Sequence, residues 1–400
     1  MSLLPVAVAL ERVLADARPL GVETVPLDEA AGRVLAEDLA AKLAQPPFDA
    51  SAMDGYAVHG TAPAPIGSQW TVIGESAAGR AFAGNVAPGE AVRIFTGAPV
   101  PEGCGTVVIQ ENVSRIGDVV TAIDVTAVGA NIRVAGVDFS EGDVLLERGR
   151  RLDAHTVTLA AAMGYGEVRV ARRPVVAILA TGDELVPPGA QPGPDQIISS
   201  NPLGIAALVT QAGGVARPLG IAPDRMDALA AKIGEARGAD ILVTIGGASV
   251  GDHDLVGQAL KSEGLELGFW KVALRPGKPL MFGRLDNMRV LGVPGNPVSA
   301  LVTARVFLVP LIKALLGEPP ALRVTESATL AAPLEANGPR LHLMRATLSR
   351  DASGAITVTP LPSQDSSLLS ALAKADCLIW RQPDAVALIA GDAVEIERLL

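Results

Sequence analysis

The sequence predicts an α/β plus β multidomain protein, with a parallel-sheet α/β domain, a small β module inserted into N-terminal helices, and a C-terminal β-barrel. Between residues 173 and 318, short apolar runs alternate with longer stretches of helical spacing, which is the pattern of a parallel sheet with helices on both faces. Residues 46–143 and 321–400 consist of short β-branched runs separated by Gly, Pro and Asp turns, as in small all-β modules. The length of 400 residues allows roughly two to four domains.

Residues 1–45 and 144–172 are expected to form one helical and linker domain, with residues 46–143 as its insertion. Residues 6–42 have the apolar spacing of helices, and Asp28 is placed to cap the second of them through its side-chain oxygen. Helical spacing returns after the β-rich stretch, and this return is what indicates an insertion.

A helix is predicted over residues 152–163, where Asp153 can cap the first turn and Gly164 can end the last. The α/β domain follows the Arg-Arg-Pro joint at 172–174. It is expected to contain, in order, a strand at 175–179, a helix at 202–213, a strand at 215–221, a helix at 224–236, a strand at 241–245, a helix at 254–263, a strand ending at Val293 and a helix at 297–316.

Composition and charge exclude several classes of protein. The formal net charge is −10 and no run of five basic residues occurs, which argues against a general nucleic-acid binder. The only cysteines, Cys104 and Cys377, are too few for a disulfide framework, so a reducing cytoplasm is expected. The longest apolar helical stretch, 298–312, contains Arg305 and Pro310 and is shorter than the roughly 20 residues of a membrane span. No membrane segment is expected.

Two acidic loops follow predicted strands of the α/β domain. Asp183 and Glu184 come directly after the strand at 175–179, and Asp252 and Asp254 follow the strand at 241–245. Ligands of open parallel sheets bind at the carboxyl ends of the strands, and carboxylate oxygens suit Mg²⁺. Taken alone, the first loop is also explained by a capping Asp in a surface turn. His253 between two carboxylates is more typical of a solvated loop than of a metal ligand.

Two further loops offer groups that can bind an anion. The PGNP loop at 294–297 opens a helix, with Asn296 as N-cap and Pro297 at the first helical position, so its backbone N–H groups face the same edge of the sheet. A purely structural role of Asn296 and Pro297, as residues that begin a helix, explains this loop equally well. The segment 270–279 contains three cations on or beside the end of a strand, namely Lys271, Arg275 and Lys278. The Pro-Gly turn between Arg275 and Lys278 can point them toward the same place.

Several familiar catalytic signatures are absent from the sequence. There is no G-x-G-x-x-G opening a helix and no G-x-x-x-x-G-K-[ST] motif, so neither a Rossmann fingerprint nor a P-loop is present. The four histidines give no readable Ser-His-Asp or Cys-His set. Metal-assisted electrostatic chemistry is the interpretation that remains.

Eight motifs together carry a resemblance to a known family. They are PPFDASAMDGYA at 46–57, FTGAPVP at 95–101, NIRVAGVDFSEGD at 131–143, TGDEL at 181–185, SNP at 200–202, GGASVGDHD at 246–254, RPGKP at 275–279 and PGNPVSA at 294–300. In these motifs the sequence resembles the molybdopterin molybdenumtransferases, which include the bacterial MoeA proteins and the E domain of gephyrin. The resemblance implies an α/β domain of the molybdopterin-binding type. It also implies insertion of molybdate into adenylylated molybdopterin with release of AMP, dependent on Mg²⁺.

The resemblance also implies roles for particular residues. The catalytic residues it implies are Asp54, Thr96, Asp138, Glu184, Asp224, Asp254, Lys271 and Arg275, and Glu184 and Asp254 are also its metal ligands. The implied substrate-binding residues are Arg133, Asp183, Ser249, Lys278, Pro294, Gly295, Asn296 and Pro297. Position 275 is Arg where relatives often carry Lys, so a planar guanidinium group replaces a compact ammonium group.

Plainer explanations of the residues before 150 stay open: Asp54-Gly55 also fits a simple β-turn, and Arg133 with Asp138 also fits a surface ion pair.

The resemblance implies a homodimer in which the segments around Asp54 and Asp138 face the α/β domain of the neighbouring subunit. The expected partners are adenylylated molybdopterin, molybdate and the adenylyltransferase that supplies the substrate. Two alternative functions for the chain are weighed against molybdate insertion. One is that of the adenylyltransferase itself, whose single domain resembles residues 174–317, and the other is that of a scaffold protein. The long N-terminal half argues against the first.

Overall fold

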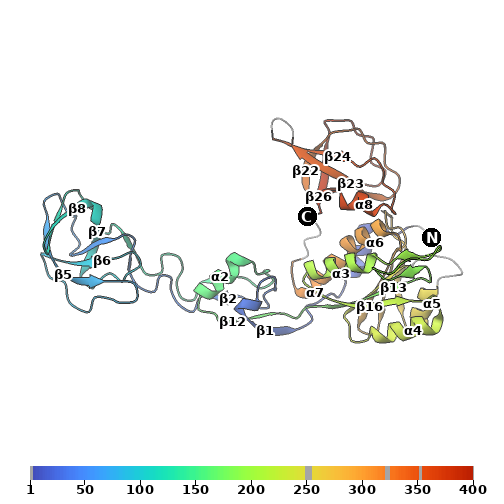
Figure 1. Cartoon of the computed structure of the whole chain (residues 1–400), viewed down its shortest axis with the longest axis horizontal. Coiled ribbons are helices and arrows are strands. Elements are labelled where there is room, and N and C mark those ends of the chain that lie inside the picture. The colour runs from blue at the N-terminus through green and yellow to red at the C-terminus, as the bar shows by residue number, and fades with distance from the viewer. Residues whose placement is uncertain (1–2, 248–254, 320–324, 351–353, 400) are drawn as a thin grey trace. The chain divides into compact units, whose positions relative to one another are not determined.

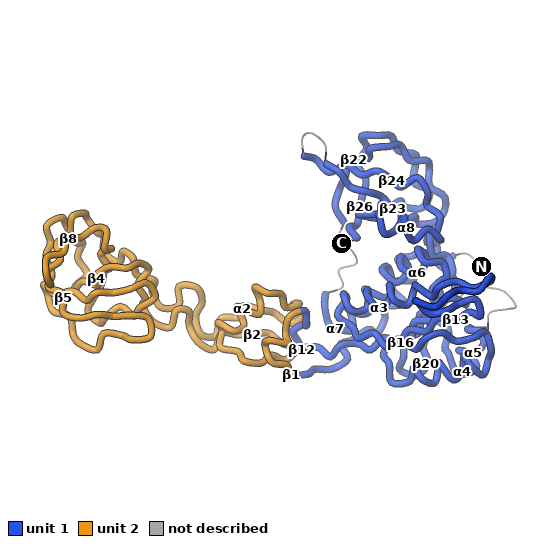
Figure 2. Tube along the Cα trace, in the orientation of Figure 1, with its two compact units in different colours: residues 1–23, 32–36, 170–400 blue, residues 24–31, 37–169 orange. Residues whose placement is uncertain are grey.

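The structure, a computed structural model, describes residues 3–247, 255–319, 325–350 and 354–399. The chain divides into two compact units (Figure 2). Unit 1 comprises residues 1–23, 32–36 and 170–400, and unit 2 comprises residues 24–31 and 37–169. The finer division into four domains stays a prediction.

Unit 2 contains a six-stranded sheet in the order β7-β4-β6-β5-β9-β8 (Figure 1). Its strands are β4 (Gly55–His59), β5 (Gln69–Ser76), β6 (Glu90–Ile94), β7 (Cys104–Ile109), β8 (Val113–Ile116) and β9 (Val119–Ala122). Tyr56, Val58 and Val108 pack on one side of this sheet, while Ala57 and Val107 pack on the other. Buried residues on both faces explain the nearly continuous apolar runs of these strands, and the predicted β module is confirmed.

Shorter elements accompany this sheet. Two-stranded pairs join β1 (Val22–Pro26) to β12 (Glu167–Ala171), β2 (Leu39–Ala40) to β11 (Val144–Leu146), and β3 (Ala50–Ser51) to β10 (Ile132–Arg133). Helix α2 (Ala154–Ala162) begins with a reciprocal cap, in which Thr156 N–H donates to Asp153 Oδ1 at 2.9 Å and Asp153 N–H donates to Thr156 Oγ1 at 2.7 Å. Gly164 has φ +92°. The predicted cap and end of this helix are therefore confirmed.

The prediction of helix over residues 6–42 is wrong beyond the first helix, α1 (Val6–Leu14). The chain continues as strand β1, a 3₁₀ turn (Leu27–Glu29) and strand β2, and Asp28 lies inside that turn without capping a helix. Pro26 ends the strand before the turn, and Gly32 has φ +78°, which is a left-handed conformation that interrupts helix. Pairing of β1 with β12 satisfies the backbone that a helix would have satisfied internally.

In unit 1 a second six-stranded sheet has the order β16-β13-β17-β21-β20-β18 (Figure 1). Its strands are β13 (Val175–Thr181), β16 (Val215–Ala222), β17 (Ile241–Ile245), β18 (Glu266–Trp270), β20 (Met281–Leu285) and β21 (Met288–Val293). The first four strands of that order are parallel, as predicted, whereas β20 pairs antiparallel with both of its neighbours, β21 and β18. A two-residue loop turns β20 into β21, and Asp286 in it has φ 54°, as tight hairpins require.

Helices cover both faces of this sheet. One face packs against α1, α3 (Asn201–Gln211) and the long helix at 297–316, and the other packs against α4 (Met226–Glu235) and α5 (Leu255–Ser262). The long helix consists of α6 (Pro297–Thr303), a π-helical segment (Ala304–Leu308) and α7 (Val309–Leu316). By length and apolarity its 20 residues could cross a membrane, but 67% of its most apolar window is buried inside the protein, as in a core helix.

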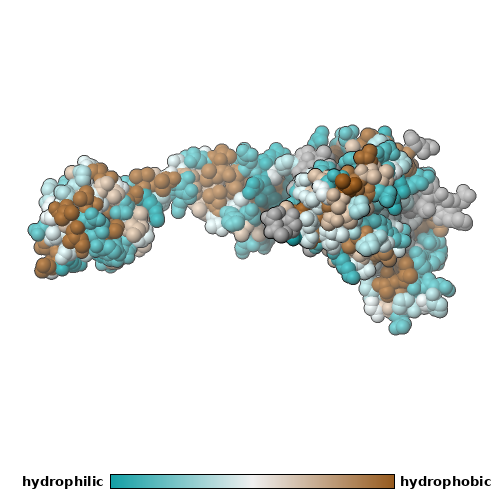
Figure 3. Space-filling model, turned by 90° about the horizontal axis from the view of Figure 1, so that it is seen from above, coloured by the Kyte–Doolittle hydropathy of each residue, from teal (hydrophilic) through white to brown (hydrophobic). Residues whose placement is uncertain are grey.

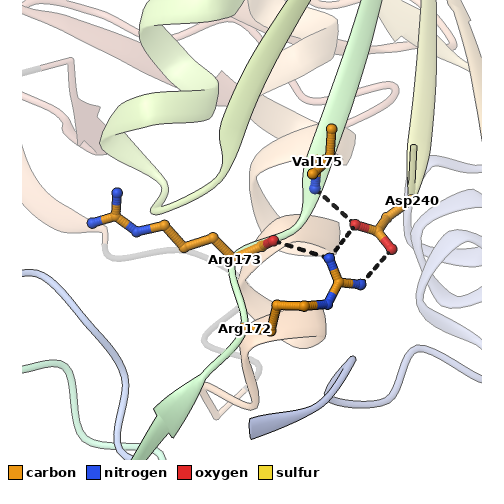
Figure 4. A network of polar contacts seen from close by, with 4 residues as sticks. All are labelled: Arg172, Arg173, Val175 and Asp240. Atoms are coloured by element: carbon orange, nitrogen blue, oxygen red, sulfur yellow. Dashed lines mark hydrogen bonds and ion pairs between the residues drawn. The ribbon is translucent and has the colours of Figure 1, made fainter. Parts of the chain in front are cut away.

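At the amino ends of β13 and β17, Asp240 anchors the chain that enters the sheet (Figure 4). The guanidinium of Arg172 donates to both oxygens of Asp240, at 2.7 and 3.1 Å, and Val175 N–H donates to the same carboxylate at 2.7 Å. Arg172 also donates to the carbonyl oxygen of Arg173 at 3.4 Å. The bidentate pair holds the pKa of Arg172 above its usual value, chiefly through these hydrogen bonds. This contact lies at the edge of the sheet opposite the carboxyl ends of the strands.

The C-terminal part of unit 1 is a closed five-stranded barrel, as predicted. Its strands β22 (Glu326–Leu330), β23 (Leu341–Arg350), β24 (Ile356–Pro360), β25 (Cys377–Arg381) and β26 (Ala393–Arg398) pair in a ring. Strand β25 and the short helix α8 (Leu369–Ala373) were not foreseen. A two-residue strand, β19 (Leu274–Arg275), adds to β23, so the segment that carries the predicted cations contacts the barrel.

Candidate functional site

Three carboxylates gather at the carboxyl ends of β13 and β16. Asp183 and Glu184 follow β13 directly, and the N–H of Asp224, after β16, donates to Asp183 Oδ1 at 3.1 Å. The pKa of Asp224 is raised, first by burial and then by the negative charges of Asp183 and Glu184. The structure therefore brings these predicted residues together, with Asp224 held near two like charges.

The PGNP loop lies beside these carboxylates and is held by two other segments. Asn201 Nδ2 donates to the Gly295 carbonyl at 2.7 Å, and Asn296 Nδ2 donates to Ser366 Oγ at 3.0 Å. Pro297 is the first helical residue, as predicted. One expectation fails here: Val298 N–H is not free for a ligand, because it donates to the Ser366 carbonyl at 3.0 Å.

A cavity of about 650 Å³ joins these elements. Its walls include Glu184 and Asp224 from the acidic loops, Ser200 and Asn201 from the start of α3, the 294–297 loop, and Ser367 from the barrel. Acidic oxygens therefore face the same space as hydroxyl, amide and backbone groups from other segments. Such a cavity can hold a ligand that combines a cation with phosphate groups.

The three predicted cations do not line this cavity. Lys271 has φ 77°, and its N–H donates to the Leu280 carbonyl at 2.9 Å. The carbonyl of Lys278 accepts from Val272 N–H at 3.0 Å, so the 271–278 segment closes on itself as a turn. Pro279, next to Lys278, lines the cavity. The turn therefore ends at the wall of the site.

Arg275 is at the barrel side of this turn, opposite His342 in the register of β19 and β23. His342 is buried, and burial followed by the positive charges of neighbouring arginines lowers its pKa to about 4. The four arginines are Arg275, Arg340, Arg345 and Arg381. The structure thus places Arg275 opposite a buried histidine whose lowered pKa favours its neutral form.

In unit 2 the segments predicted to carry Asp54 and Thr96 meet directly. Asp54 Oδ1 accepts from both the N–H and the hydroxyl of Thr96, each at 2.8 Å. These two hydrogen bonds, the backbone one first, hold the pKa of Asp54 below its usual value. Because Asp54 is anchored to a residue 42 positions away, it is more than the simple β-turn considered from the sequence.

The third predicted segment of unit 2 lies along the first. Arg133 pairs with Ala50 in the β10–β3 ladder, and Asp138 N–H donates to the Gln45 carbonyl at 3.0 Å. Both side chains are exposed. In the described part of the chain no ion pair joins Arg133 to Asp138, so the alternative of a surface ion pair between them is not supported.

Most of the GGASVGDHD motif, residues 248–254, lies outside the described residues. This stretch contains Ser249, Asp252, His253 and Asp254, so the second acidic loop and the second predicted metal ligand stay predictions. Elsewhere, in residues 3–247, 255–319, 325–350 and 354–399, no group of three or more Asp, Glu, His or Cys side chains is placed to hold a metal.

Sequence reasoning missed residues that the structure places in or against the cavity. Ser367 lines it and Ser366 contacts the PGNP loop, although no residue after 318 was among those predicted for the site. Ser199 and Ser200 also line it. The SNP motif at 200–202 was a usable signal for Ser200, whereas no local pattern marks the barrel serines.

Comparison with known proteins shows similarity along nearly the whole chain. Residues 4–164 match the family description "MoeA N-terminal region (domain I and II)", residues 177–314 match "Probable molybdopterin binding domain", and residues 327–399 match "MoeA C-terminal region (domain IV)".

Relatives and solved structures agree with these matches. A molybdopterin molybdenumtransferase of Haemophilus influenzae is 37% identical over 391 residues, which cover 95% of this chain and 94% of the relative. Molybdopterin molybdenumtransferase 2 of Mycobacterium tuberculosis is 36% identical over 96% of this chain and 97% of its own length. A crystal structure of the molybdopterin biosynthesis MoeA protein of a Pyrococcus species superimposes with a TM-score of 0.84, at 30% identity and 99% coverage of both chains.

Proposed function

The chain belongs to the MoeA family of molybdopterin molybdenumtransferases, transferases of molybdenum cofactor biosynthesis, and from this premise we propose that it inserts molybdate into adenylylated molybdopterin with release of AMP, dependent on Mg²⁺. The observation that carries the proposal is the cavity in which Glu184 and Asp224 share a wall with the PGNP loop. A phosphoanhydride needs charge neutralisation and positioning more than it needs a protein nucleophile.

The residues present suit Mg²⁺. Carboxylate oxygens are the hard donors that this ion binds, and the raised pKa of Asp224 beside Asp183 and Glu184 marks a crowding of negative charge that a cation relieves. Mg²⁺ is commonly held by one or two carboxylates and completed by water and substrate phosphates, which fits Glu184 as a ligand together with Asp254. Bound there, the ion supplies Lewis-acid polarisation of the phosphoanhydride.

The chain's own groups have distinct parts in this proposal. Asn201, by holding the Gly295 carbonyl, and Ser366, by holding Asn296, fix the PGNP loop so that it positions the substrate without moving. Lys278 carries positive charge at the edge of the same space and attracts the phosphates and molybdate.

We further propose a homodimer in which the unit 2 segments complete the site of the neighbouring subunit. Asp54, with Thr96, is fixed but lies at the protein surface. Four large apolar side chains in or beside the same segments are exposed: Phe48 by 42%, Met53 by 43%, Val134 by 55% and Val137 by 60%. Hydrophobic surface is visible over unit 2 in Figure 3, and exposed apolar patches of this kind mark interaction sites.

Mixed dimers of Asp54→Ala and Glu184→Ala chains should then regain activity at one of two sites. No gain after proven subunit exchange would exclude a shared site.

A cytoplasmic location and a functional contact with the adenylyltransferase that supplies the substrate complete the proposal. The two cysteines are free thiols, which fits a reducing compartment. The test of the function is incubation of the purified protein with adenylylated molybdopterin, Mg²⁺ and molybdate. AMP release that depends on both ions supports the proposal, and no release under these conditions refutes it.

A further inference from the structure

A small ribbon forms an apolar part of the cavity wall. Strands β14 (Leu185–Val186) and β15 (Ile197–Ile198) pair in parallel, with Leu185 opposite Ile197 and Val186 opposite Ile198. Side chains of directly paired residues share a face of a sheet. Leu185 and Ile197 both line the cavity. Of the second pair, Ile198 also lines the cavity and Val186 does not, so the first pair is the one that presents a continuous apolar face.

The ribbon is held in place by backbone contacts. Ile197 N–H donates to the Glu184 carbonyl at 2.8 Å, and Ser199 N–H donates to the Val186 carbonyl at 2.8 Å. The apolar pair is therefore tied to the loop that supplies Glu184. Any group that packs on Leu185 and Ile197 lies beside the carboxylates of the site.

The exposure of Ile197, beside the half-buried Leu185, is the observation that calls for an explanation. Ile197 is 58% exposed although it belongs to a concave cavity wall, which it shares with the exposed carboxylates of Glu184 and Asp224. Apolar area left open to water in a cavity wall is area that a ligand can cover, and its removal from water favours binding. Ser199, a buried residue, and Ser200, a half-buried one, line the same cavity, and a serine hydroxyl can form a hydrogen bond with the polar edge of such a ligand.

We propose that Leu185 and Ile197 form the face against which a planar nitrogen heterocycle of the substrate packs, a role that rests on the proposed function. The substrate proposed above contains two such rings, the pterin and the adenine, and both combine a flat apolar face with polar edges. Phosphates joined to either ring can reach the carboxylates and the PGNP loop in the same cavity. The two rings share the recognition chemistry, and the experiment separates them.

The experiment compares Ile197→Ala and Ile197→Leu with wild type. The matched control is Leu203→Ala, since Leu203 is 63% exposed on α3 and does not line the cavity. Binding of three probes is measured by calorimetry: AMP, 6-hydroxymethylpterin and inorganic pyrophosphate. Michaelis parameters for AMP release from the full substrate are measured in parallel.

Ile197→Ala should weaken binding of one ring probe at least fivefold, raise KM by a similar factor and leave pyrophosphate affinity and kcat nearly unchanged. Ile197→Leu should retain most of the affinity, and Leu203→Ala all of it. An effect on AMP alone assigns the face to adenine, and an effect on the pterin alone assigns it to the pterin. Unchanged affinities for both rings in Ile197→Ala, with normal wild-type turnover, overturn this inference and leave the proposed function standing. Wild type that releases no AMP counts against the function instead.

Discussion

Replacement of Glu184 by Gln tests the acidic cluster without changing its size. Glu184 and Asp183 raise the pKa of the neighbouring Asp224 by their negative charge, after burial as the larger cause. Glu184→Gln removes one of the two charges and one carboxylate ligand of the proposed Mg²⁺ site. The protein without Mg²⁺ should therefore become slightly more stable, while its response to Mg²⁺ should be lost.

The two effects differ in size. The carboxylates are exposed, so relief of their repulsion is screened and should contribute only about 0.3 kcal/mol. Mg²⁺ at ten times its Kd stabilises the wild type by about 1.4 kcal/mol, from RT ln(1 + [L]/Kd). For a unit of this size that corresponds to a rise in Tm of roughly 3–6 °C. In the variant the rise should fall below about 1 °C.

Thermal unfolding of both proteins with and without Mg²⁺ measures these shifts, and AMP release is followed on the same samples. Asp195→Asn is the matched control, because Asp195 is an exposed carboxylate in the β14–β15 connection and does not line the cavity. A Mg²⁺-induced rise in Tm of Glu184→Gln equal to that of the wild type would refute the assignment.

Three further predictions concern the cations, the anchor and the buried histidine. Lys278→Ala should weaken binding of molybdate or pyrophosphate at least about tenfold, which is about 1.4 kcal/mol, and unchanged calorimetric affinities relative to Lys374→Ala on the barrel would place the anion site elsewhere. Asp240→Ala removes three hydrogen bonds and, after allowance for the 40% exposure of Arg172, should lower the free energy of unfolding by about 2 kcal/mol; denaturant curves that match the wild type would contradict this. Because the folded pKa of His342 is about 4 rather than 6.5, the neutral form is favoured in the fold, so stability should fall as pH drops from about 6.5 to about 4. His342→Gln should flatten that slope, and an unaltered pH profile of Tm would show that another group causes it.

Local patterns predicted the local structure of this chain well. The cap at Asp153 and the end of its helix at Gly164 depend on residues a few positions apart, and both were visible in the sequence. The stretch after the first helix misled the prediction, because its Ala and Leu spacing is helical while β1 and β2 pair with strands that are distant in the sequence. Tertiary pairing overrides propensity in such segments.

The residues of the site also differ in whether local sequence patterns could predict them. Asp183 and Glu184 follow a strong strand signal, so their place at the sheet edge could be predicted. Asp224 follows a weaker strand and was indicated only by resemblance to a family. Ser367 reaches the cavity from a barrel whose sequence has no motif, and only the packing of that barrel against the PGNP loop brings it there. A contact of this kind has no local signature in a single sequence.

The most direct test of the proposed reaction is the ratio of molybdenum incorporated to AMP released in a single turnover. The protein is mixed with one equivalent of adenylylated molybdopterin, Mg²⁺ and excess molybdate, and the pterin product is separated and its metal content measured by mass spectrometry. Coupled insertion predicts about one molybdenum atom per AMP, and neither product without molybdate. Stoichiometric AMP release with a pterin product that contains no molybdenum would contradict the account, since the protein would then only hydrolyse its substrate.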